Sequence, residues 1–230
     1  MSRSQSVEDY LKAIYKLELN LDGKGVPTSE LAREMGVANA SVTNMVKRLS
    51  ELGMATHQSY YGTKLTESGK KIALEMIRHH RLLELYLAEM LGYSWDQVHD
   101  EAEKLEHHIS EQFEDRISEL LDDPKFDPHG DPIPSKDGKI PRLGLKPLSE
   151  INESTKIIVK RVKNQDPELL RYLHTYGLTP GSNVKVIKKE PFDGPLELLV
   201  DGKTVTLGHN IAEDILVVYP GESKNQPQAV

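Results

Sequence analysis

Histidine and acidic residues gather in the middle third of the sequence. Five of the nine histidines lie between positions 79 and 108, and residues 76–150 carry 17 Asp and Glu against 9 Lys and Arg. Imidazole and carboxylate groups bind Mn²⁺, Fe²⁺, Co²⁺ and Zn²⁺ in proteins, and several carboxylates favour the harder ions. Because the chain has no cysteine, any metal that it binds must be held by oxygen and nitrogen donors.

The spacing of these residues places them on shared faces of predicted helices. Residues three or four positions apart are neighbours on one side of an α-helix. A single group of this kind is more often a solvated, salt-bridged helix face, whereas two aligned groups on consecutive helices favour metal binding. The positions that share faces are His99, Glu103, Glu106 and His107 on the later helix and His80 and Glu84 on the earlier one.

Other chemistry is not indicated. The H-E-x-x-H motif of zinc hydrolases and the Gly-rich phosphate-binding loop do not occur, and no spare base lies beside the candidate ligands. We therefore expect neither an enzyme nor a small-molecule substrate. Four further histidines are interpreted as surface residues: His79, His108, His129 and His174.

The elements before this cluster are helical. Apolar residues at three- and four-residue spacing predict a first helix over residues 7–17, which the Gly and Pro residues at 23–27 end. Two shorter helices separated by a tight turn at Gly36 follow, and then two short strands up to residue 66. Helices and a β-hairpin in this order indicate a winged helix–turn–helix.

The second short helix carries small polar side chains at its start, where a recognition helix meets base edges. Asn pairs with adenine through two hydrogen bonds, and basic and Tyr side chains hold phosphates. Residues 24–71 carry a net charge of +3 although the whole chain carries −7, which favours DNA over the alternative of a protein-interaction module. The predicted DNA-binding residues are Asn39, Ala40, Ser41, Thr43, Asn44, Lys47, Arg48, Tyr60, Tyr61 and Lys64.

Two longer helices and a β-rich region follow. Amphipathic stripes predict helices over 67–91 and 94–121. Six of the thirteen prolines lie between 124 and 147, where neither helix nor sheet should persist. Five short strands and one short helix in about seventy residues then indicate a small barrel. The predicted fold class is mainly α with a β-rich C-terminal domain.

Composition shifts divide the chain into five predicted segments. No apolar run approaches the roughly 20 residues of a membrane span, and the N-terminus lacks the apolar stretch of a signal peptide, so we expect a cytoplasmic protein with no membrane partner. The segments are a DNA-binding domain at 1–72, a helical metal-binding and dimerisation domain at 73–123, a Pro-rich linker at 124–147, a small β-barrel at 148–220 and a flexible tail at 221–230.

Several stretches of the chain resemble the diphtheria toxin repressor family of metal-dependent transcriptional regulators. They are VEDYLKAIYKL, SVTNMVKRL, HHRLLELYL and VHDEAEKLEHHIS. The likeness covers residues 5–135, including the GDPIP stretch, and continues beyond residue 148 as the family's appended SH3-like barrel. It implies a homodimer that binds a palindromic operator in double-stranded DNA and represses metal-uptake genes.

The resemblance also implies two metal sites. The primary site joins a residue of the first helix to three ligands on the dimerisation helix, and the second takes a ligand from the barrel. The corresponding residues are Asp9, Glu103, Glu106 and His107 for the primary site and His80, Glu84, His99 and Asp166 for the second. A companion polar ligand of the barrel is Leu169 here, so the barrel's role stays open between donating a ligand, docking on the prolines and holding the dimer together.

The ligand types favour manganese as the cofactor. Iron-sensing members of the family have methionine and cysteine where this chain has Asp9 and Glu103, and replacing two soft sulfur donors with carboxylates hardens the site. Fe²⁺ is the alternative working metal, and Co²⁺, Zn²⁺, Ni²⁺ or Cd²⁺ would be surrogates. Paired-metal members carry another carboxylate at the position of Lys12, so we expect two separated sites rather than a close binuclear pair.

The expected mechanism is a metal ion that bridges the DNA-binding and dimerisation domains. Such a bridge would select the spacing at which two recognition helices fit half-sites roughly one helical turn apart. The apolar stripes at 82–91 and 98–120 would form the two-fold interface. The remaining alternative is a metal-independent regulator or scaffold whose histidines are incidental.

Overall fold

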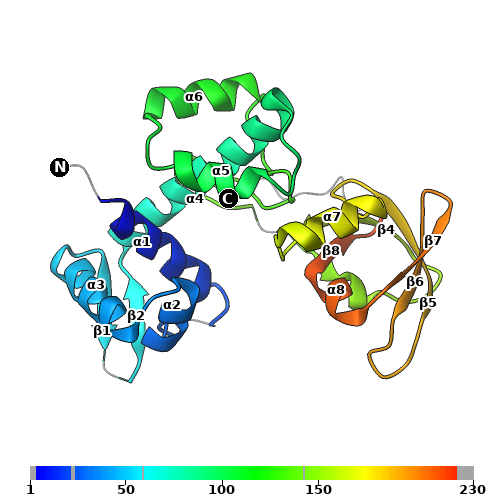
Figure 1. Ribbon diagram of the computed structural model, residues 1–230, viewed down its shortest axis with the longest axis horizontal. Coiled ribbons are helices and arrows are strands. Elements are labelled where there is room, and N and C mark those ends of the chain that lie inside the picture. The colour runs from blue at the N-terminus through cyan, green and yellow to red at the C-terminus, as the bar shows by residue number, and fades with distance from the viewer. Residues whose placement is uncertain (1–3, 22–23, 59, 142, 222–230) are drawn as a thin grey trace. The chain divides into compact units, whose positions relative to one another are not determined.

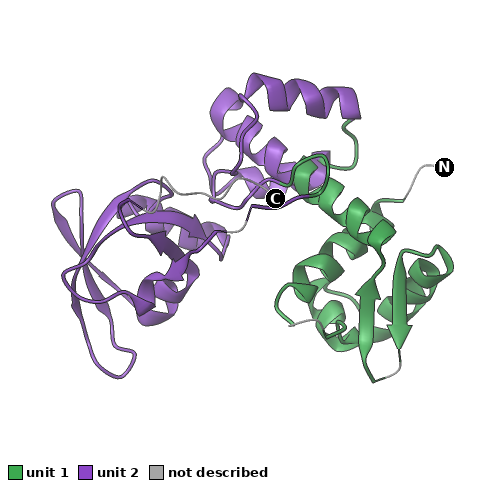
Figure 2. Cartoon of the chain, turned by 180° about the vertical axis from the view of Figure 1, so that it is seen from behind, with its two compact units in different colours: residues 1–79, 106–109, 134–138 green, residues 80–105, 110–133, 139–230 purple. Residues whose placement is uncertain are grey.

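The structure is a computed structural model that describes residues 4–21, 24–58, 60–141 and 143–221 (Figure 1). Residues 222–230, most of the predicted tail, lie outside the described residues. The chain forms two compact units (Figure 2). Unit 1 contains residues 1–79, 106–109 and 134–138, and unit 2 contains residues 80–105, 110–133 and 139–230.

Unit 1 is built on three helices and a β-hairpin, as the sequence predicts (Figure 1). Its buried apolar residues recur at helical spacing, for example Val42, Val46 and Leu49, and form one core. The elements are α1 (Gln5–Glu18), α2 (Thr28–Glu34), α3 (Asn39–Glu51), β1 (Ala55–Gln58), β2 (Gly62–Leu65) and the first half of α4 (Glu67–Leu91).

A third extended segment joins the wing. Val26 and Thr63 exchange backbone hydrogen bonds of 2.8 and 2.9 Å, so the chain before α2 pairs with β2. A side chain at Gly25 would overlap the backbone of the hairpin, which explains glycine at this close approach. Together these contacts hold the hairpin against the helix–turn–helix and complete the predicted winged helix.

The helical part of unit 2 differs from the prediction at one point. The sequence predicts a single helix over 94–121, but the structure has α5 (Val98–Leu105) and α6 (Glu111–Leu120) with a break between them. Ser110 is the N-cap of α6, and its hydroxyl accepts a hydrogen bond of 3.2 Å from the backbone N–H of Phe113. The apolar stripe continues through the break, which is why periodicity alone indicated one helix.

The Pro-rich stretch also differs from the expected linker. The structure has no regular helix or strand in the described residues 122–145, as predicted, yet residues 129–134 are buried. Arg81 donates a hydrogen bond of 2.6 Å to the Pro132 carbonyl, and Arg161 lies 2.6 Å from Asp131 in an ion pair. Residues 129–133 are therefore packed in unit 2 rather than part of a solvated spacer.

The C-terminal part of unit 2 is the predicted small SH3-like β-barrel. Its six strands have the order β3-β8-β4-β5-β6-β7, and all neighbours are antiparallel. The prediction missed β3 and α8. The elements are β3 (Lys146–Pro147), a 3₁₀ turn (Leu148–Glu150), β4 (Lys156–Val162), α7 (Pro167–Thr175), β5 (Asn183–Lys189), β6 (Leu196–Val200), β7 (Lys203–Leu207), α8 (His209–Asp214) and β8 (Ile215–Val218).

Alternating burial along the strands builds the barrel's core. In β5 the buried residues Val184 and Val186 alternate with the exposed residues Asn183, Lys185 and Ile187, the period expected when one face of a sheet is covered. Within the described residues, no helix of either unit is long and apolar enough to cross a membrane.

Candidate metal centre

Three of the predicted primary-site ligands meet in unit 1. The side chains of Asp9, Glu106 and His107 each offer a donor atom within 4.8 Å of the others, and we call them the Asp9 group. The His107 Nε2 atom lies 2.8 Å from Asp9 Oδ1 and 3.5 Å from Glu106 Oε1. Asp9 is on α1, whereas the other two follow the end of α5, so the break after Leu105 presents two ligands to a helix of the winged-helix unit.

A cation belonging to the chain lies beside these donors. The Lys12 ammonium forms an ion pair of 2.5 Å with Glu106 Oε1, and both side chains are buried. The backbone of the same segment is held by His79, whose Nδ1 is 3.2 Å from the Glu106 carbonyl oxygen. His79 is 6% exposed, so its interpretation as a surface residue was wrong. Its buried imidazole contacts the backbone of the segment that carries Glu106 and His107.

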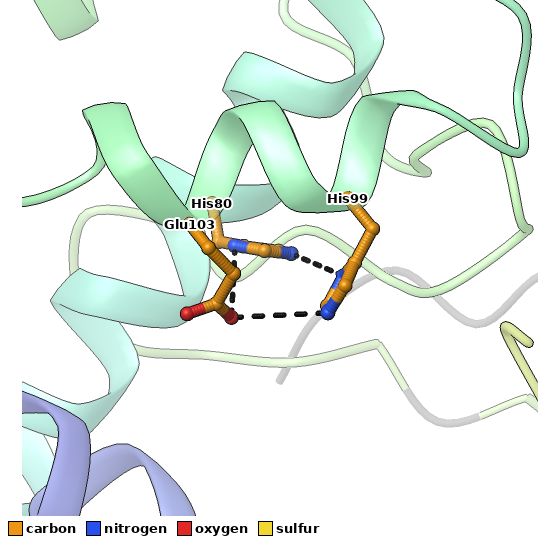
Figure 3. A group of neighbouring side chains, drawn as sticks. All are labelled: His80, His99 and Glu103. Atoms are coloured by element: carbon orange, nitrogen blue, oxygen red, sulfur yellow. Dashed lines mark hydrogen bonds and ion pairs between the residues drawn. The ribbon is translucent and has the colours of Figure 1, made fainter.

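Glu103 belongs to a different group from the one predicted. Its carboxylate lies in unit 2 with the imidazoles of His80 and His99, and we call these three the His80 group (Figure 3). The two rings meet edge to face, with His80 Nε2 3.1 Å from His99 Nδ1, and Glu103 Oε1 lies 3.6 Å from His80 Nδ1. The helix-face pattern did not anticipate this grouping, because Glu103 meets the two imidazoles of unit 2 whereas Glu106 and His107, in the turn after α5, meet Asp9.

A third group contains two residues that sequence reasoning missed. Glu84, Asp127 and His129 offer donors within 4.8 Å of one another, all from buried side chains, and we call them the Glu84 group. His129 is fully buried, so its interpretation as a surface residue was wrong. The signal was present in the stretch DPHGDPIP, where Asp and His stand two apart, but its prolines led to the linker prediction.

The Glu84 group has polar atoms directed at one another without hydrogen bonds. Glu84 Oε2, Asp127 Oδ2 and His129 Nδ1 are buried and have no hydrogen-bond partner among the described residues. His129 Nε2 lies 2.7 Å from the Trp95 carbonyl oxygen, to which it donates. This bond leaves Nδ1 as the nitrogen that faces the carboxylates, an arrangement typical of a metal-binding imidazole.

One carboxylate links the two groups of unit 2. Glu84 Oε1 is 2.9 Å from His80 Nε2 and 3.2 Å from His99 Nδ1, while Oε2 is 3.8 Å from His129 Nδ1. Burial acts to raise the pKa of Glu84, but the charge of His80, the nearby His129 ring and hydrogen bonds with His80 and His99 hold that pKa well below its ordinary value. Glu84 is therefore an anion at neutral pH, ready to meet positive charge on either side.

The charge on His129 responds in the opposite direction. Burial acts to lower its pKa, but the nearby Glu84 carboxylate, the charge of Asp127 and the Trp95 carbonyl together raise it. The raised pKa reflects the negative charge that the two carboxylates direct at the His129 ring. A divalent ion would offset that negative charge, so the donor set fits a metal of the oxygen- and nitrogen-binding class.

The structure does not bring Asp166 to any of these three groups. It is exposed at the N-cap of α7, where its carboxylate accepts hydrogen bonds of 2.9 and 3.1 Å from the backbone N–H groups of Glu168 and Leu169. Capping already gives this aspartate a structural reason to be present. The barrel's described contact with the Glu84 group is made instead by backbone, since Val162 N–H donates to the His129 carbonyl.

The residues predicted to contact DNA share one property, which is exposure. On α3 they occupy the side away from the core, whose positions are Val42, Val46 and Leu49. At the wing, Tyr60 and Tyr61 are 105% and 75% exposed. The exposed residues of the predicted set are Asn39, Ala40, Ser41, Thr43, Asn44, Lys47, Arg48, Tyr60, Tyr61 and Lys64.

Three family models match successive parts of the chain. Residues 3–63 match the N-terminal DNA-binding domain of iron-dependent repressors, and residues 66–135 match their metal-binding and dimerisation domain. Residues 146–219 match the FeoA domain. The three matches follow the order winged helix, helical domain and small barrel that the structure shows.

Whole-length relatives agree with these matches. The chain is 28% identical over 228 residues to the iron-dependent repressor IdeR of Mycobacterium tuberculosis, covering 92% of this chain and 96% of IdeR. A manganese-dependent transcriptional repressor solved in complex with manganese is 37% identical, with a TM-score of 0.82 and coverage of 92% and 99%. ScaR with bound Zn²⁺ is 35% identical, with a TM-score of 0.75 and coverage of 93% and 99%. The chain therefore belongs to the diphtheria toxin repressor family, the iron-dependent family of metal-dependent transcriptional repressors.

Proposed function

We propose that the chain is a Mn²⁺-dependent repressor in which the Asp9 group is the switch. The observation that carries the proposal is that α1, part of the DNA-binding unit, and the segment after α5 supply donors to one group. A bound divalent cation would offset the negative charge of the Asp9 and Glu106 carboxylates. Asp9 would hold α1 to this segment, and His107 would fix the segment's orientation.

The switch would act on the dimer through the chain itself. Residues 106–109 connect α5 to α6, so holding them to α1 restrains the helices on both sides. Those helices expose apolar side chains that suit a two-fold interface: Leu105 is 37%, Phe113 45% and Leu120 59% exposed. Fixing α1 against this dimer would set the spacing of two recognition helices and favour a palindromic operator.

The second metal site of the proposal is centred on Glu84 rather than on Asp166. Its carboxylate lies between the His80 group and the Glu84 group, and three of the buried atoms around it have no hydrogen-bond partner in the described structure. Buried polar atoms in this state are costly, and a cation would satisfy all three at once. We propose that this site stabilises unit 2, whereas the Asp9 group controls binding to DNA.

The donors favour Mn²⁺ as the working metal. The three groups contain five carboxylates and four imidazoles and no sulfur, and carboxylate-rich sets favour hard ions. The solved manganese-dependent repressor is consistent with this choice, while IdeR keeps Fe²⁺ as the alternative. A repressor of this kind would act in the cytoplasm, on genes for metal uptake.

The proposal is tested by selecting binding sites from a random double-stranded DNA pool at fixed salt, with Mn²⁺ and with a chelator. Fixed salt matters because binding to phosphates alone would otherwise imitate the result. We expect enrichment of an inverted repeat only with Mn²⁺. The selected site is then titrated with wild-type protein, with Asp9→Ala and with His174→Ala, a control at an exposed histidine outside the three groups.

Each outcome of the selection decides something. The same repeat enriched without metal would remove the sensor and keep DNA binding. No enrichment with Mn²⁺ but enrichment with Fe²⁺ under anaerobic conditions would replace the metal. No enrichment under any condition would contradict the repressor and favour a protein-interaction module.

A further inference from the structure

One polar stripe of α1 contacts the segment that carries two proposed ligands. The stripe's four members stand at i, i+3, i+4 and i+7, so they share a helix face. Two of them, Glu8 and Asp9, contact the same imidazole from opposite sides. The contacts are Gln5 with His108, Glu8 with His107, Asp9 with His107 and Lys12 with Glu106.

The His107 ring is held at both nitrogens. Its Nδ1 lies 2.8 Å from Glu8 Oε2 and its Nε2 lies 2.8 Å from Asp9 Oδ1. The side chains of His107 and Glu8 are 7% and 13% exposed, so little water can compete for the bond to Nδ1. A carboxylate within hydrogen-bond distance of Nδ1 accepts its proton and leaves Nε2 as the nitrogen that can bind a metal.

We propose that Glu8 is a positioning residue for the metal site of the Asp9 group. Its carboxylate accepts the Nδ1–H of His107, selects that tautomer and turns Nε2 toward Asp9 and Glu106. The inference rests on the proposed function of this group. It adds that α1 contributes both a ligand and the residue that orients the other ligand, so undocking α1 weakens the site twice.

The bond from Glu8 has a role that the rest of the stripe does not supply. Gln5 and Lys12 also tie α1 to residues 106–108, but they contact His108 and Glu106 rather than the His107 ring. If Glu8 served only to attach α1, loss of its carboxylate would be tolerated in the metal site. If it orients the ring, the loss must change the tautomer of His107 as well as the affinity for metal.

The test compares Glu8→Ala, which removes the acceptor, with Glu8→Gln, which keeps an amide oxygen able to accept from Nδ1–H. Glu168→Gln, an exposed site on α7, is the control for loss of one negative charge. Mn²⁺ affinity is measured by calorimetry on full-length protein. We expect Glu8→Ala to weaken binding about 10- to 100-fold, the usual effect of removing such a partner, and Glu8→Gln to recover most of the loss.

A second readout follows the tautomer directly. Protein labelled with ¹⁵N-histidine and loaded with Zn²⁺, which is diamagnetic, is examined by long-range ¹H–¹⁵N correlation, with His107→Gln used to assign the signals. We expect a protonated Nδ1 on His107 in the wild type and in Glu8→Gln. In Glu8→Ala the signal should shift or split.

The outcomes separate this inference from the proposed function. Asp9→Ala is included as the site control. If Asp9→Ala binds Mn²⁺ like the wild type, the proposed site itself is wrong and the inference fails with it. If Asp9→Ala loses binding while Glu8→Ala does not, or while the His107 signal is unchanged in Glu8→Ala, only the role of Glu8 is overturned.

Discussion

The Asp9 group in unit 1 and the Glu84 group in unit 2 each bring two carboxylates together with one imidazole, but the negative charges are compensated differently. In unit 1, the Lys12 ammonium forms an ion pair with the buried Glu106, and each nitrogen of the His107 ring lies 2.8 Å from a carboxylate oxygen. In unit 2, Glu84, Asp127 and His129 each keep a buried polar atom without a hydrogen-bond partner. The donors of the first group therefore have partners within the chain, whereas three buried atoms of the second have none among the described residues.

The contrast between the two groups predicts a different role for metal binding in each unit. Donors that already have partners add little free-energy cost to the metal-free fold. The free energy of metal binding at the Asp9 group can therefore change how firmly α1 is held. A group with orphaned buried atoms lowers the stability of the metal-free fold, so metal binding there is expected to appear as stabilisation. Under the proposed function, metal binding in unit 1 should control DNA binding and metal binding in unit 2 should raise thermal stability.

Substitutions in the Asp9 group are expected to have the greatest effect. Asp9→Ala or His107→Ala should weaken Mn²⁺-dependent operator binding by about 5- to 150-fold, the usual size of the coupling between two binding sites, because each removes a donor of the group. Titration of labelled operator in Mn²⁺ measures the effect, with His174→Ala as control. Circular dichroism should show an unchanged fold. Operator affinity equal to that of the wild type in either variant would contradict the switch.

The next prediction concerns the backbone that positions the Glu84 group. Gly130 has φ of +85°, and a Cβ there would overlap the Lys160 carbonyl oxygen. Gly130→Ala should therefore displace the segment that carries Asp127 and His129 and cost about 2–4 kcal/mol, or about 5–10 °C in Tm. The rise in Tm on adding Mn²⁺ should shrink as well.

Gly92→Ala is the matched control for this prediction. Gly92 also has positive φ, +73°, but a Cβ there meets no atom within 4 Å, so the substitution should cost only about 1 kcal/mol. Equal losses of Tm in the two variants, measured by calorimetry with and without Mn²⁺, would show that the close approach to β4 does not matter.

A smaller effect is expected from Lys12, whose ammonium lies beside the Asp9 group in unit 1. Lys12→Gln removes the ammonium that lies 2.5 Å from Glu106, so the group becomes more negative and should bind Mn²⁺ about tenfold more tightly, the size of one screened charge interaction. The metal-free variant should be less stable, because Glu106 loses its cation. Calorimetric titration measures both affinity and stoichiometry, with Lys188→Gln as control. Weaker Mn²⁺ binding would mean that Lys12 supports the site rather than competing with the metal.

The smallest effect is a pH dependence that belongs to unit 2. The pKa of His129 is raised, so its contribution to stability is present below about pH 6.5 and lost as pH rises through the raised value. The pKa of Glu84 is lowered, so its contribution is lost only as pH falls through that lowered value. The metal-free protein should therefore lose stability on the alkaline side, and Mn²⁺ should stabilise it more as pH rises.

Melting curves between about pH 5 and about pH 9, with chelator and with Mn²⁺, check this dependence. His129→Gln should flatten the alkaline loss, and His174→Ala should leave it unchanged. A Tm that falls equally with pH in the wild type and in His129→Gln would place the titrating group elsewhere.

Sequence patterning predicted most of the elements because their causes are local. The apolar stripe of residues 67–91 matches α4 over its full length, and the alternation in β5 follows from burial of one face. Where two local signals conflicted, the prediction was wrong. The stripe through Leu105, Ile109 and Phe113 indicated one helix, although Ser110 had the chemistry of a new N-cap.

The candidate site was predicted only in part. The donors themselves were found by type and spacing, and the family resemblance added Asp9. Their grouping was not predicted, because Glu103 and Glu106 contribute to different groups although they are only three residues apart, and the side chains that meet depend on how this segment packs. His129 was missed because proline composition describes backbone regularity and carries no information on burial.

The sequence by itself determined the winged helix, the long helices, the small barrel and the kinds of donor available for metal. Helix and strand formation depend on neighbours within a few residues, so their signals can be read locally. Only the tertiary structure decided that Glu8 and Asp9 share one imidazole from 98 or more positions away, and that Asp127 and His129 face Glu84. Such contacts depend on how distant elements pack and on which polar atoms face each other once water is excluded. No local sequence pattern encodes that arrangement.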